Sequence, residues 1–535
     1  MKQKSINRTI KRAQLMRYLW TLLYIGIALI LCPIRAKAAM EQSHSTSVAG
    51  MVKLVLLEAK LIENLSSYAD ELEKKLNILK RVVPLLQEKS NKAMSQMEQY
   101  VSNPINAFSL IRRLHKDWNK WKLFMEEPLG SSQVAYVNEH KAQLPSPTDM
   151  DETCQGLHRL YDVYNLTVKD IVRGLINGKQ YNASLGALDT YAMGKYLDHY
   201  RIRDLASEWF AETSKSLMQH TLPIPMGGER QQVLQLFARA FIKQKHYTIA
   251  LPLLDHALIK GNKTNNSDLL SERAQIEELA RAAPKLRPSI RYTTDYARGC
   301  RSQYVQQTNL ICKYKFRPSP FLRLAPLKME VLVVKPFIVA FHDVLSPHEI
   351  GELQQLAMPL LKRTTVYDSN SGLHGSVKGT RTSKGFWLSR SHNNLTKRIA
   401  RRISDMTGFH LEGSTSLQVM NYGLSGHYAL HTDYFNTTEL IAPESPTGDR
   451  IATVLFYLSD VEQGGDTVFP RIEQVFKPER GKALFWYNLH RNGTGDKRTQ
   501  HGACPVLVGS KWIMTQWINE RPQLFARPCL RESTK

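Results

Sequence analysis

The feature that most constrains the fold of this chain is a change in residue composition and hydrophobic pattern near residue 330. From there on, short runs rich in valine, isoleucine, threonine and aromatic residues alternate with turns rich in glycine, proline, asparagine and aspartate. Short strands at regular spacing are typical of closed all-β folds. We therefore predict a double-stranded β-helix, or jelly roll, over residues 330–535, with a helix over Pro347–Leu361 on its outside. The predicted strands are Val331–Val334, Phe337–Phe341, Leu417–Tyr422, Ile451–Tyr457, Thr467–Phe469, Ala483–Tyr487 and Trp512–Ile518.

Residues 39–145 have helical periodicity instead. Apolar residues recur at three- and four-residue steps over residues 48–86, which predicts one long helix, and Pro84 predicts a bend or an end there. A second helix is expected after Pro104. The two patterns are compatible with intramolecular packing or with a dimerisation domain, and they favour neither. The apolar face of the second helix contains Phe108, Ile111, Trp118 and Trp121.

Residues 146–265 are predicted to be all helical, with a weak internal repeat. The same offsets of 3, 12 and 16 residues separate two sets of small and apolar side chains. Such offsets match a tetratricopeptide helix pair, in which small residues let two helices approach closely, although a chance helical hairpin is the alternative. The segment Leu222–Gly228 reads as an inserted loop, and residues 266–329 as a linker. The two sets are Gly194, Leu197, Ala206 and Phe210, and Ala238, Phe241, Ala250 and Leu254.

Residues 1–38 are predicted to be a signal peptide. A basic segment precedes an apolar run over Tyr18–Leu31, and Ala36-Lys37-Ala38 follows as a cleavage pattern. The run is shorter than the ~20 residues of a bilayer span, which argues against the alternative of an uncleaved anchor. Cleavage would remove eight Lys and Arg residues and lower the net charge from +24 to +16. We see no dense basic stripe with interleaved aromatic residues, so nucleic acid is not an expected partner.

The cysteines predict disulfides in an oxidising lumen. Cys300 with Cys312, and Cys504 with Cys529, are the expected pairs, with Cys154 left over and buried thiols as the alternative. Glycosylation sequons fit the same compartment. The last five residues, Arg531–Lys535, contain no retention signal, so if the chain stays in the endoplasmic reticulum, something else is expected to hold it there. The sequons begin at Asn64, Asn165, Asn182, Asn262, Asn394, Asn436 and Asn492.

One constellation predicts a metal site. His431 and Asp433 lie in the strand-like segment Gly426–Tyr434, where residues i and i+2 point to the same face. A further ligand is expected from His501, 68 positions after Asp433. Two histidines and one carboxylate with open positions form the facial triad of non-haem Fe(II) oxygenases. A His-x-Asp triplet alone is a weak signal, and a hydrogen-bonded histidine in a barrel is its alternative.

A lysine strengthens this interpretation. Lys511 lies ten residues beyond His501. One strand length away from the metal, its ammonium group would reach the distal carboxylate of a five-carbon dicarboxylate bound there. The alternative is a surface lysine. The pattern therefore predicts a five-carbon dicarboxylate bound to the metal.

The segments around these residues resemble the collagen prolyl 4-hydroxylase alpha subunits. The resemblance covers nearly the whole chain after residue 38, and it is strongest over residues 330–530. It is carried by Asn421–Asp433 (NYGLSGHYALHTD), Arg450–Asp460 (RIATVLFYLSD), Gly464–Pro470 (GGDTVFP), Phe485–Leu489 (FWYNL) and His501–Gly509 (HGACPVLVG).

The resemblance implies procollagen-proline 4-dioxygenase activity with Fe(II), 2-oxoglutarate and ascorbate. It also implies a dimerisation domain over residues 39–145, a peptide-binding domain over residues 146–265, and a two-plus-two tetramer with protein disulfide isomerase in the endoplasmic reticulum lumen. A lysine at position 511 favours 4-hydroxylation, since related hydroxylases of other specificity have arginine there. By the same resemblance His431, Asp433 and His501 bind iron, Lys511 binds the distal carboxylate, Tyr422, Thr453 and Trp517 line the cosubstrate pocket, and Tyr428 lies near the substrate.

The match has three departures. Ser425-Gly426 stands where the family has two glycines, and serine adopts a positive φ less readily. The helix over Leu236–Ile242 has no tyrosine, whereas relatives that bind collagen display tyrosines on the corresponding groove helix. A glycan on Asn436 would lie near the mouth of the site. Collagen is therefore not assumed to be the substrate. The competing functions are an oxygenase acting on another residue or protein, and a catalytically silent assembly or proline-rich-peptide-binding subunit.

Overall fold

The computed structural model describes residues 44, 46–219, 230–260, 267–283, 293–305, 311–364, 366–368, 373–375, 380–435 and 447–525. They belong to two compact units. One contains Gly50–Ser146, and the other contains the preceding segment and everything from Pro147 on. The predicted signal peptide lies outside the described residues. Within the described ranges, no helix has both the length and the apolar content needed to cross a membrane.

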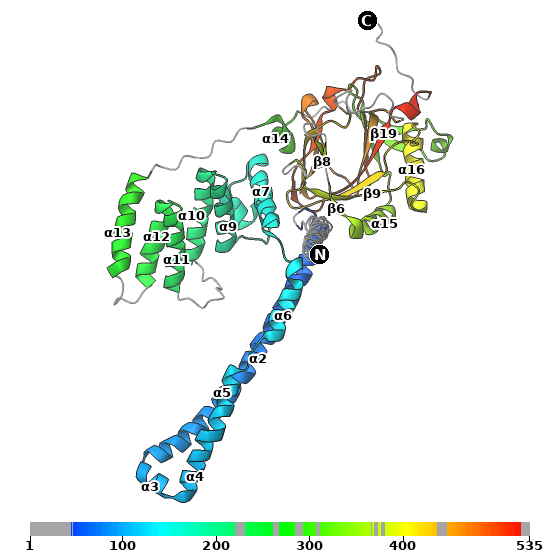
Figure 1. Ribbon diagram of the computed structural model, residues 1–535. Helices are drawn as coiled ribbons and strands as arrows, with labels where there is room; N and C mark the ends of the chain where they lie inside the picture. Colours follow the sequence, from blue (N-terminus) through cyan, green and yellow to red (C-terminus); the bar gives the residue numbers. More distant parts are fainter. Residues whose placement is uncertain are drawn as a thin grey trace, which may run out of the picture. The chain divides into compact units, whose positions relative to one another are not determined.

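The Gly50–Ser146 unit is a long helical hairpin (Figure 1). Of the two outcomes predicted at Pro84, a bend or an end, the end was wrong, because the first helix, α2, continues through it. Proline removes one backbone hydrogen bond, and the turns on either side keep theirs. The returning helices pack on α2 through Gln133, whose side chain donates to Ser67 and Glu71. The helices are α2 (Val48–Met94), α3 (Met97–Ser102), α4 (Pro104–Arg112), a π-helical turn η1 (Arg113–Asp117), α5 (Trp118–Glu126) and α6 (Ser131–His140).

Helix pairs follow in the second unit, and α9 to α13 lie side by side (Figure 1). The eight residues of the predicted repeat are all buried, at the contacts of α9 with α10 and of α11 with α12. A Cβ at Gly194 would lie only 2.4 Å from the Phe210 ring, which explains the need for a small residue there. The predicted inserted loop lies outside the described residues. The helices are α7 (Pro147–Val163), α8 (Val168–Arg173), α9 (Ala187–His199), α10 (Arg203–Gln219), α11 (Arg230–Lys243), α12 (Tyr247–Lys260), α13 (Ser267–Ala282) and α14 (Asp295–Cys300).

The C-terminal region is rich in antiparallel strands, and all seven predicted strands are present. Nine strands form a large sheet in the order β3-β4-β5-β16-β12-β19-β10-β9-β6, and four form a smaller sheet in the order β11-β17-β14-β15. The large sheet contains β3 (Ile311–Lys315), β4 (Leu327–Val333), β5 (Ile338–His342), β6 (Lys362–Arg363), β9 (Ser383–Leu388), β10 (Leu417–Tyr422), β12 (Arg450–Tyr457), β16 (Ala483–Tyr487) and β19 (Trp512–Asn519). The smaller sheet contains β11 (Tyr428–His431), β14 (Thr467–Phe469), β15 (Gln474–Phe476) and β17 (His501–Ala503).

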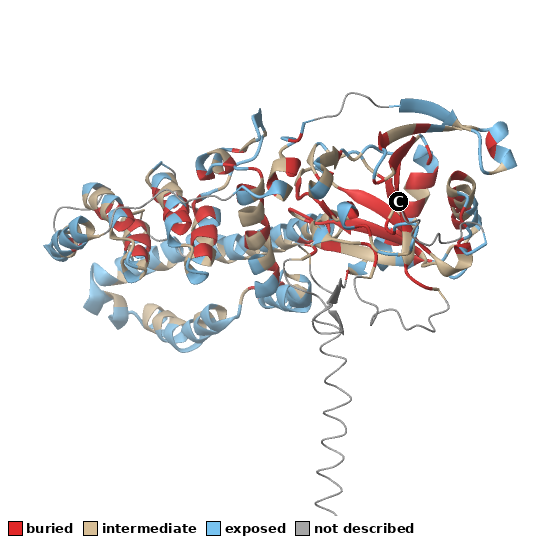
Figure 2. Ribbon diagram, turned by 90° about the horizontal axis from the view of Figure 1, so that it is seen from above, coloured by how far each residue is buried: buried red, intermediate tan, exposed pale blue. Residues whose placement is uncertain are grey.

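Two-stranded pairings complete the strands, and they are β1 (Leu175–Ile176) with β2 (Lys179–Gln180), β13 (Gln463–Gly464) with β18 (Val506–Val508), and β7 (Val366–Asp368) with β8 (Leu373–Gly375). Two helices, α15 (Pro347–Ala357) and α16 (Asn394–Thr407), pack on the large sheet. The helix predicted from Pro347 is confirmed. Its start is set by Ser346 and Glu349, which cap each other's backbone N–H groups. Figure 2 shows the buried residues concentrated in the sheets and on the inner sides of the helices.

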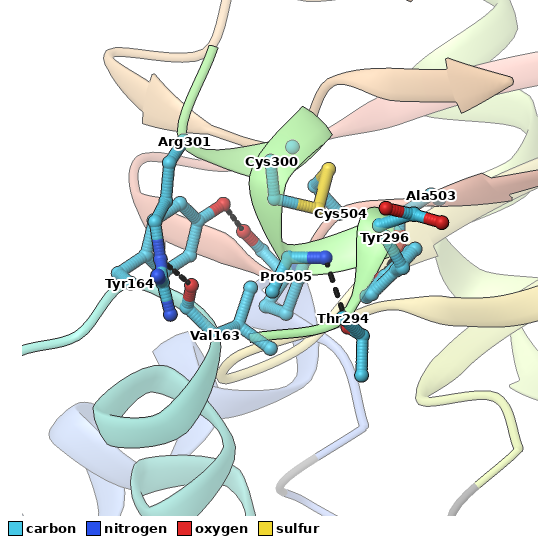
Figure 3. Close-up of a disulfide and its surroundings, with 12 residues drawn as sticks. Val163, Tyr164, Thr294, Tyr296, Cys300, Arg301, Ala503, Cys504 and Pro505 are labelled. Carbon is cyan, nitrogen blue, oxygen red and sulfur yellow. Dashed lines mark hydrogen bonds between the residues drawn. A yellow bond between two sulfur atoms is a disulfide. The ribbon is translucent and has the colours of Figure 1, made fainter. Parts of the chain in front are cut away.

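The disulfide differs from both predicted pairings. Cys300 in α14 is bonded to Cys504, 204 residues away (Figure 3). Cys312 is exposed and free in β3, and Cys529 lies outside the described residues. Sequence proximity suggested Cys312, but β3 is the edge strand of the large sheet, whereas α14 packs on the smaller sheet. The leftover Cys154 is buried, and its burial raises the pKa of its thiol to about 11.

Candidate metal centre

His431, Asp433 and His501 converge on one point. One ligand atom from each side chain lies within 4.8 Å of the other two. The two histidines face each other as a register pair between β11 and β17. Asp433 is not on the strand, as the i and i+2 argument assumed, because β11 ends at His431. The bend that follows the strand turns the carboxylate back, so that its Oδ1 lies 3.5 Å from His431 Nε2.

The backbone orients both imidazole rings. His431 Nδ1 lies 2.9 Å from the carbonyl oxygen of Ala429, and His501 Nδ1 lies 2.9 Å from that of Thr499. A carbonyl oxygen only accepts hydrogen bonds, so each Nδ1 carries the hydrogen. The Nε2 atoms are then left with free lone pairs that point toward Asp433, which is the arrangement that metal-binding histidines show.

The protonation states suit a metal ion. Burial opposes the ionised form of Asp433, but His501, His431 and Arg450 outweigh it and hold the pKa of this carboxyl well below its usual range. Burial, together with His431, lowers the pKa of His501 to about 4. Two imidazoles and one carboxylate are the donor set of a facial Fe(II) site. The three residues therefore fit an iron ion.

Thr453 holds the carboxylate in place. Its Oγ1 donates to Asp433 Oδ2 over 2.7 Å, and it accepts a hydrogen bond of 2.9 Å from Asn488 Nδ2. All three residues are buried. Asn488 donates to the Thr453 hydroxyl, so the only hydrogen of that hydroxyl goes to Asp433 Oδ2. These two hydrogen bonds fix the carboxylate so that Oδ1 remains free for a metal. Thr453 was expected to line a cosubstrate pocket, and Asn488 was not singled out.

Lys511 lies in the same cleft but not on the strand of His501. It precedes β19 in the large sheet, and its backbone accepts a hydrogen bond from the N–H of Tyr422. Its side chain is buried, with Nζ donating to the carbonyl oxygen of Gly465 and lying 5.1 Å from the centre of the Tyr422 ring. Burial lowers the pKa of Lys511 to about 8. A buried ammonium group in a cleft is a ready partner for a carboxylate of a ligand.

All the other predicted site residues line this cleft too. Tyr422, Tyr428, Thr453 and Trp517 lie around it with the three ligand residues and Lys511. The Tyr428 ring stacks on His431 with 3.7 Å between ring centroids. Apolar side chains close much of the wall, and they include Met420, Leu455, Trp486 and Ile513.

Two arginines near the site were not predicted. Arg381 lines the cleft, with its guanidinium 4.5 Å from the centre of the Tyr428 ring. Arg450 lies 4.4 Å from the centre of the Trp517 ring and donates to the backbone oxygen of Asp433. Arg450 begins one of the segments that carry the family resemblance, which was the available signal. Nothing in the spacing marks Arg381, which reaches the site because it pairs with Tyr428 as an isolated bridge.

The segment after His501 is anchored from the helical part of the same unit. The disulfide bonds Cys504 to α14, and Tyr296 donates a hydrogen bond of 2.8 Å to the carbonyl oxygen of Ala503 (Figure 3). From the residue after α7, Tyr164 donates to the carbonyl oxygen of Pro505. Three consecutive residues are thus fixed by groups distant in the sequence, which limits the movement of the strand that holds His501.

Comparison with known proteins bears directly on this site. The profile described as "Prolyl 4-Hydroxylase alpha-subunit, N-terminal region" matches residues 47–178, and that of the 2OG-Fe(II) oxygenase superfamily matches residues 417–519. Prolyl 4-hydroxylase subunit alpha-1 of Rattus norvegicus is 32% identical over 96% of this chain and 99% of its own length. The chain belongs to the prolyl 4-hydroxylase alpha-subunit family.

Other members agree with this assignment. Prolyl 4-hydroxylase subunit alpha-1 of Caenorhabditis elegans is 34% identical over 90% of both chains. Among solved structures, the viral collagen prolyl hydroxylase of Paramecium Bursaria Chlorella virus-1, in complex with 2-oxoglutarate, covers 34% of this chain and 95% of its own, with 23% identity and a TM-score of 0.28.

As a prolyl 4-hydroxylase alpha subunit, the chain is a dioxygenase of the iron and 2-oxoglutarate class. The matched oxygenase region contains His431, Asp433 and His501, which are the residues that the structure brings together. The helical N-terminal region and the strand-rich C-terminal region are confirmed.

Proposed function

We propose that this chain is the catalytic alpha subunit that hydroxylates peptidyl-proline at C4, using O2 and 2-oxoglutarate and releasing succinate and CO2. The observation that carries the proposal is the convergence of His431, Asp433 and His501 in a cleft whose wall also holds the buried ammonium group of Lys511. This is one metal site and one carboxylate partner in a single cleft. Iron supplies the oxidising chemistry when it is bound with 2-oxoglutarate and O2.

Each protein group has a role in this proposal. His431, Asp433 and His501 hold the iron on one side and leave its other positions open. Lys511 pairs with the distal carboxylate of 2-oxoglutarate, since its ammonium group has three hydrogens and donates only one to the Gly465 carbonyl. Thr453 keeps Asp433 oriented.

The walls of the cleft complete the proposed site. Tyr422 and Trp517 line the cosubstrate pocket, and Tyr428 lies on the substrate side. The apolar wall restricts water near the reacting atoms, which protects a strong oxidant from side reactions.

The proposed architecture follows the family. The two antiparallel sheets support a jelly roll for the catalytic domain, and the paired helices α9 to α12 support a tetratricopeptide-like domain that binds the peptide substrate. The structure also contains a tyrosine in the groove region, Tyr191, which comes from α9 and not from the helix over Leu236–Ile242. The substrate is therefore proposed as a proline-containing secreted peptide, with collagen as one member of that class.

The helical hairpin supports self-association. Large apolar side chains on α2, α4, η1 and α5 are more than half exposed within the described chain, which is unusual for residues of this kind unless another surface covers them. We further propose protein disulfide isomerase as the beta subunit of an alpha2beta2 tetramer in the endoplasmic reticulum lumen, and ascorbate as the reductant that restores iron. The apolar residues include Val55, Leu56, Ile62, Leu65, Phe108, Ile111, Leu114 and Trp118.

The test is 2-oxoglutarate turnover by the full chain co-expressed with protein disulfide isomerase. Fe(II), ascorbate and a panel of proline-containing peptides are supplied, and mass spectrometry locates any added oxygen. The expected result is one oxygen on proline C4, absent when His431→Ala replaces the wild type. Oxygen on another residue would favour a different hydroxylase. No turnover by a folded, iron-loaded complex would favour a silent peptide-binding subunit.

A further inference from the structure

A groove of about 560 Å³ opens on the helical part of the second unit, away from the metal ligands in sequence and in the elements that form it. It lies where α9 and α11 meet, together with the start of α10 and the turn after α11. The residues that matter here are Tyr191, Lys195, Asp198, Arg203, Lys243 and Lys245.

The floor of the groove is aromatic. Tyr191 is held edge-on against two buried rings, with centroid distances of 5.1 Å to Phe237 and 5.8 Å to Phe241. Gln244 donates to its hydroxyl group over 3.4 Å, which fixes the ring in place. A fixed tyrosine ring is the kind of surface on which an extended, proline-rich segment packs.

The rim of the groove is positively charged. Lys195, Arg203, Lys243 and Lys245 are exposed, and within the described part of the chain none of them has a carboxylate within ion-pair distance. Among the residues that line the groove, Asp198 supplies a carboxylate, which lies 3.7 Å from His246. Four cations against one carboxylate leave three positive charges in excess.

These four cations form no ion pair inside the described part of the unit, and Lys195 Nζ lies over the Tyr191 ring, 5.8 Å from its centre. Other cations nearby are paired, as Arg239 is with Glu272 and Arg273 is with Asp255. Unpaired cations of one sign around a concave surface raise the local concentration of anionic ligands and suppress the binding of cationic ones. The groove therefore combines a floor suited to proline with a rim suited to carboxylates.

We propose that this groove selects peptide segments that carry aspartate or glutamate close to proline, and discriminates against lysine- and arginine-rich ones. The inference rests on the proposed function, because it names the class of peptide that the hydroxylase takes. Proline rings pack on Tyr191, and the acidic side chains pair with Lys195, Lys243 and Lys245 on the rim.

Direct binding tests this without any need for turnover. The His431→Ala full-length chain, co-expressed with protein disulfide isomerase, is titrated with three fluorescent peptides of equal length and proline content. One contains glutamate, one has glutamine at the same positions, and one has lysine. The glutamate peptide is expected to bind about tenfold more tightly than the glutamine peptide at low salt, since each of several exposed pairs adds about twofold to fivefold. The difference is expected to shrink at about 0.5 M salt.

The groove is then neutralised by combining Lys195→Gln, Lys243→Gln and Lys245→Gln. The glutamate peptide is expected to lose about tenfold in affinity, while the glutamine peptide changes by less than about twofold. A control protein with Lys335→Gln, Lys397→Gln and Lys497→Gln loses the same charge from exposed positions in the C-terminal region. It is expected to keep the preference for glutamate.

Equal affinity for the glutamate and glutamine peptides would overturn the inference. The same holds if the control protein loses as much affinity for the glutamate peptide as the groove variant does, or if no peptide binds. Turnover of the same peptides by the His431-containing chain is measured separately. Hydroxylation without a preference for glutamate overturns the groove inference alone. A preference for glutamate without hydroxylation overturns the proposed function and leaves an acidic-peptide-binding subunit.

Discussion

The hydroxyl group of Thr453 donates its only hydrogen to Oδ2 of Asp433 in a buried hydrogen bond of 2.7 Å. The two residues come from different segments, since Thr453 lies in β12 of the large sheet and Asp433 follows β11 of the smaller one. The bond therefore joins the two sheets at the metal site. It makes the geometry of the carboxylate depend on the large sheet.

Replacing Thr453 by valine keeps the shape of the side chain and removes this bond. We expect metal affinity to fall by about tenfold to a hundredfold, because groups that orient metal ligands have effects of that size. Titration of the apoprotein with Co(II), followed by absorption spectroscopy, measures the change. Thr453→Ser keeps the hydroxyl and should retain most of the affinity. Equal metal affinity of the valine variant and the wild type would contradict an orienting role.

Removing the carboxylate itself should have a larger effect. Asp433→Asn replaces the anionic ligand by a neutral amide, so we expect Fe(II) binding to be lost at micromolar metal and 2-oxoglutarate turnover with it. Metal content after dialysis is the measurement. A variant that retained stoichiometric iron would place the metal elsewhere.

Lys511 predicts the pH dependence of cosubstrate binding. Burial lowers its pKa to about 8, so the ammonium group is lost from the free enzyme as the pH rises through 8. The KM for 2-oxoglutarate should then increase by up to about tenfold per pH unit above that value. Measurement of KM between pH 7 and pH 9.5 tests this. Lys511→Arg, which keeps its charge over this range, should remove the dependence.

The same shift predicts the sign of a stability effect. The folded chain binds fewer protons at Lys511 than the unfolded chain between pH 8 and the ordinary lysine value, 10.5. The contribution of this group to the free energy of unfolding therefore rises with pH in that window. Lys511→Met should lack this rise when chemical denaturation is compared at pH 8 and pH 9.5.

The disulfide between Cys300 and Cys504 predicts a loss of stability on mutation, and the free Cys312 provides the control. Cys300→Ser should destabilise the second unit by about 2–5 kcal/mol, because the bond closes a long loop and its loss frees the segment after His501. Cys312→Ser removes an exposed free thiol and should change the free energy of unfolding by less than about 0.5 kcal/mol. Thermal unfolding under oxidising conditions compares the two.

Peptide mapping of the unreduced protein checks the pairing itself. The expected product of proteolysis is a cross-linked pair of peptides containing Cys300 and Cys504. Recovery of Cys504 linked to Cys529 would instead support the pairing expected from sequence proximity.

The strands and helices could be predicted from the sequence because they depend on local patterns. Runs such as Leu417–Tyr422 and Ala483–Tyr487 coincide with β10 and β16, since β-branched and aromatic residues between turn residues leave few other structures open. The helix end predicted as one outcome at Pro84 was wrong for the same reason. A local rule allows a helix end there, while α2 continues ten residues beyond it to Met94.

Part of the chemistry of the site could also be predicted from local sequence patterns. The residue types and spacing of His431, Asp433, His501 and Lys511 by themselves indicate iron and a dicarboxylate. The tertiary structure decided three features that the spacing does not contain. His431 and His501 are register partners on neighbouring strands, and Asp433 reaches them through a bend. Thr453 and Asn488 support the carboxylate. The tertiary structure also decided that Cys504 pairs with Cys300 and that Tyr191 forms the floor of a cationic groove. The reason is physical: propensity and periodicity act over a few residues, whereas pairing across sheets and between helices depends on which surfaces meet when the whole chain buries its apolar side chains.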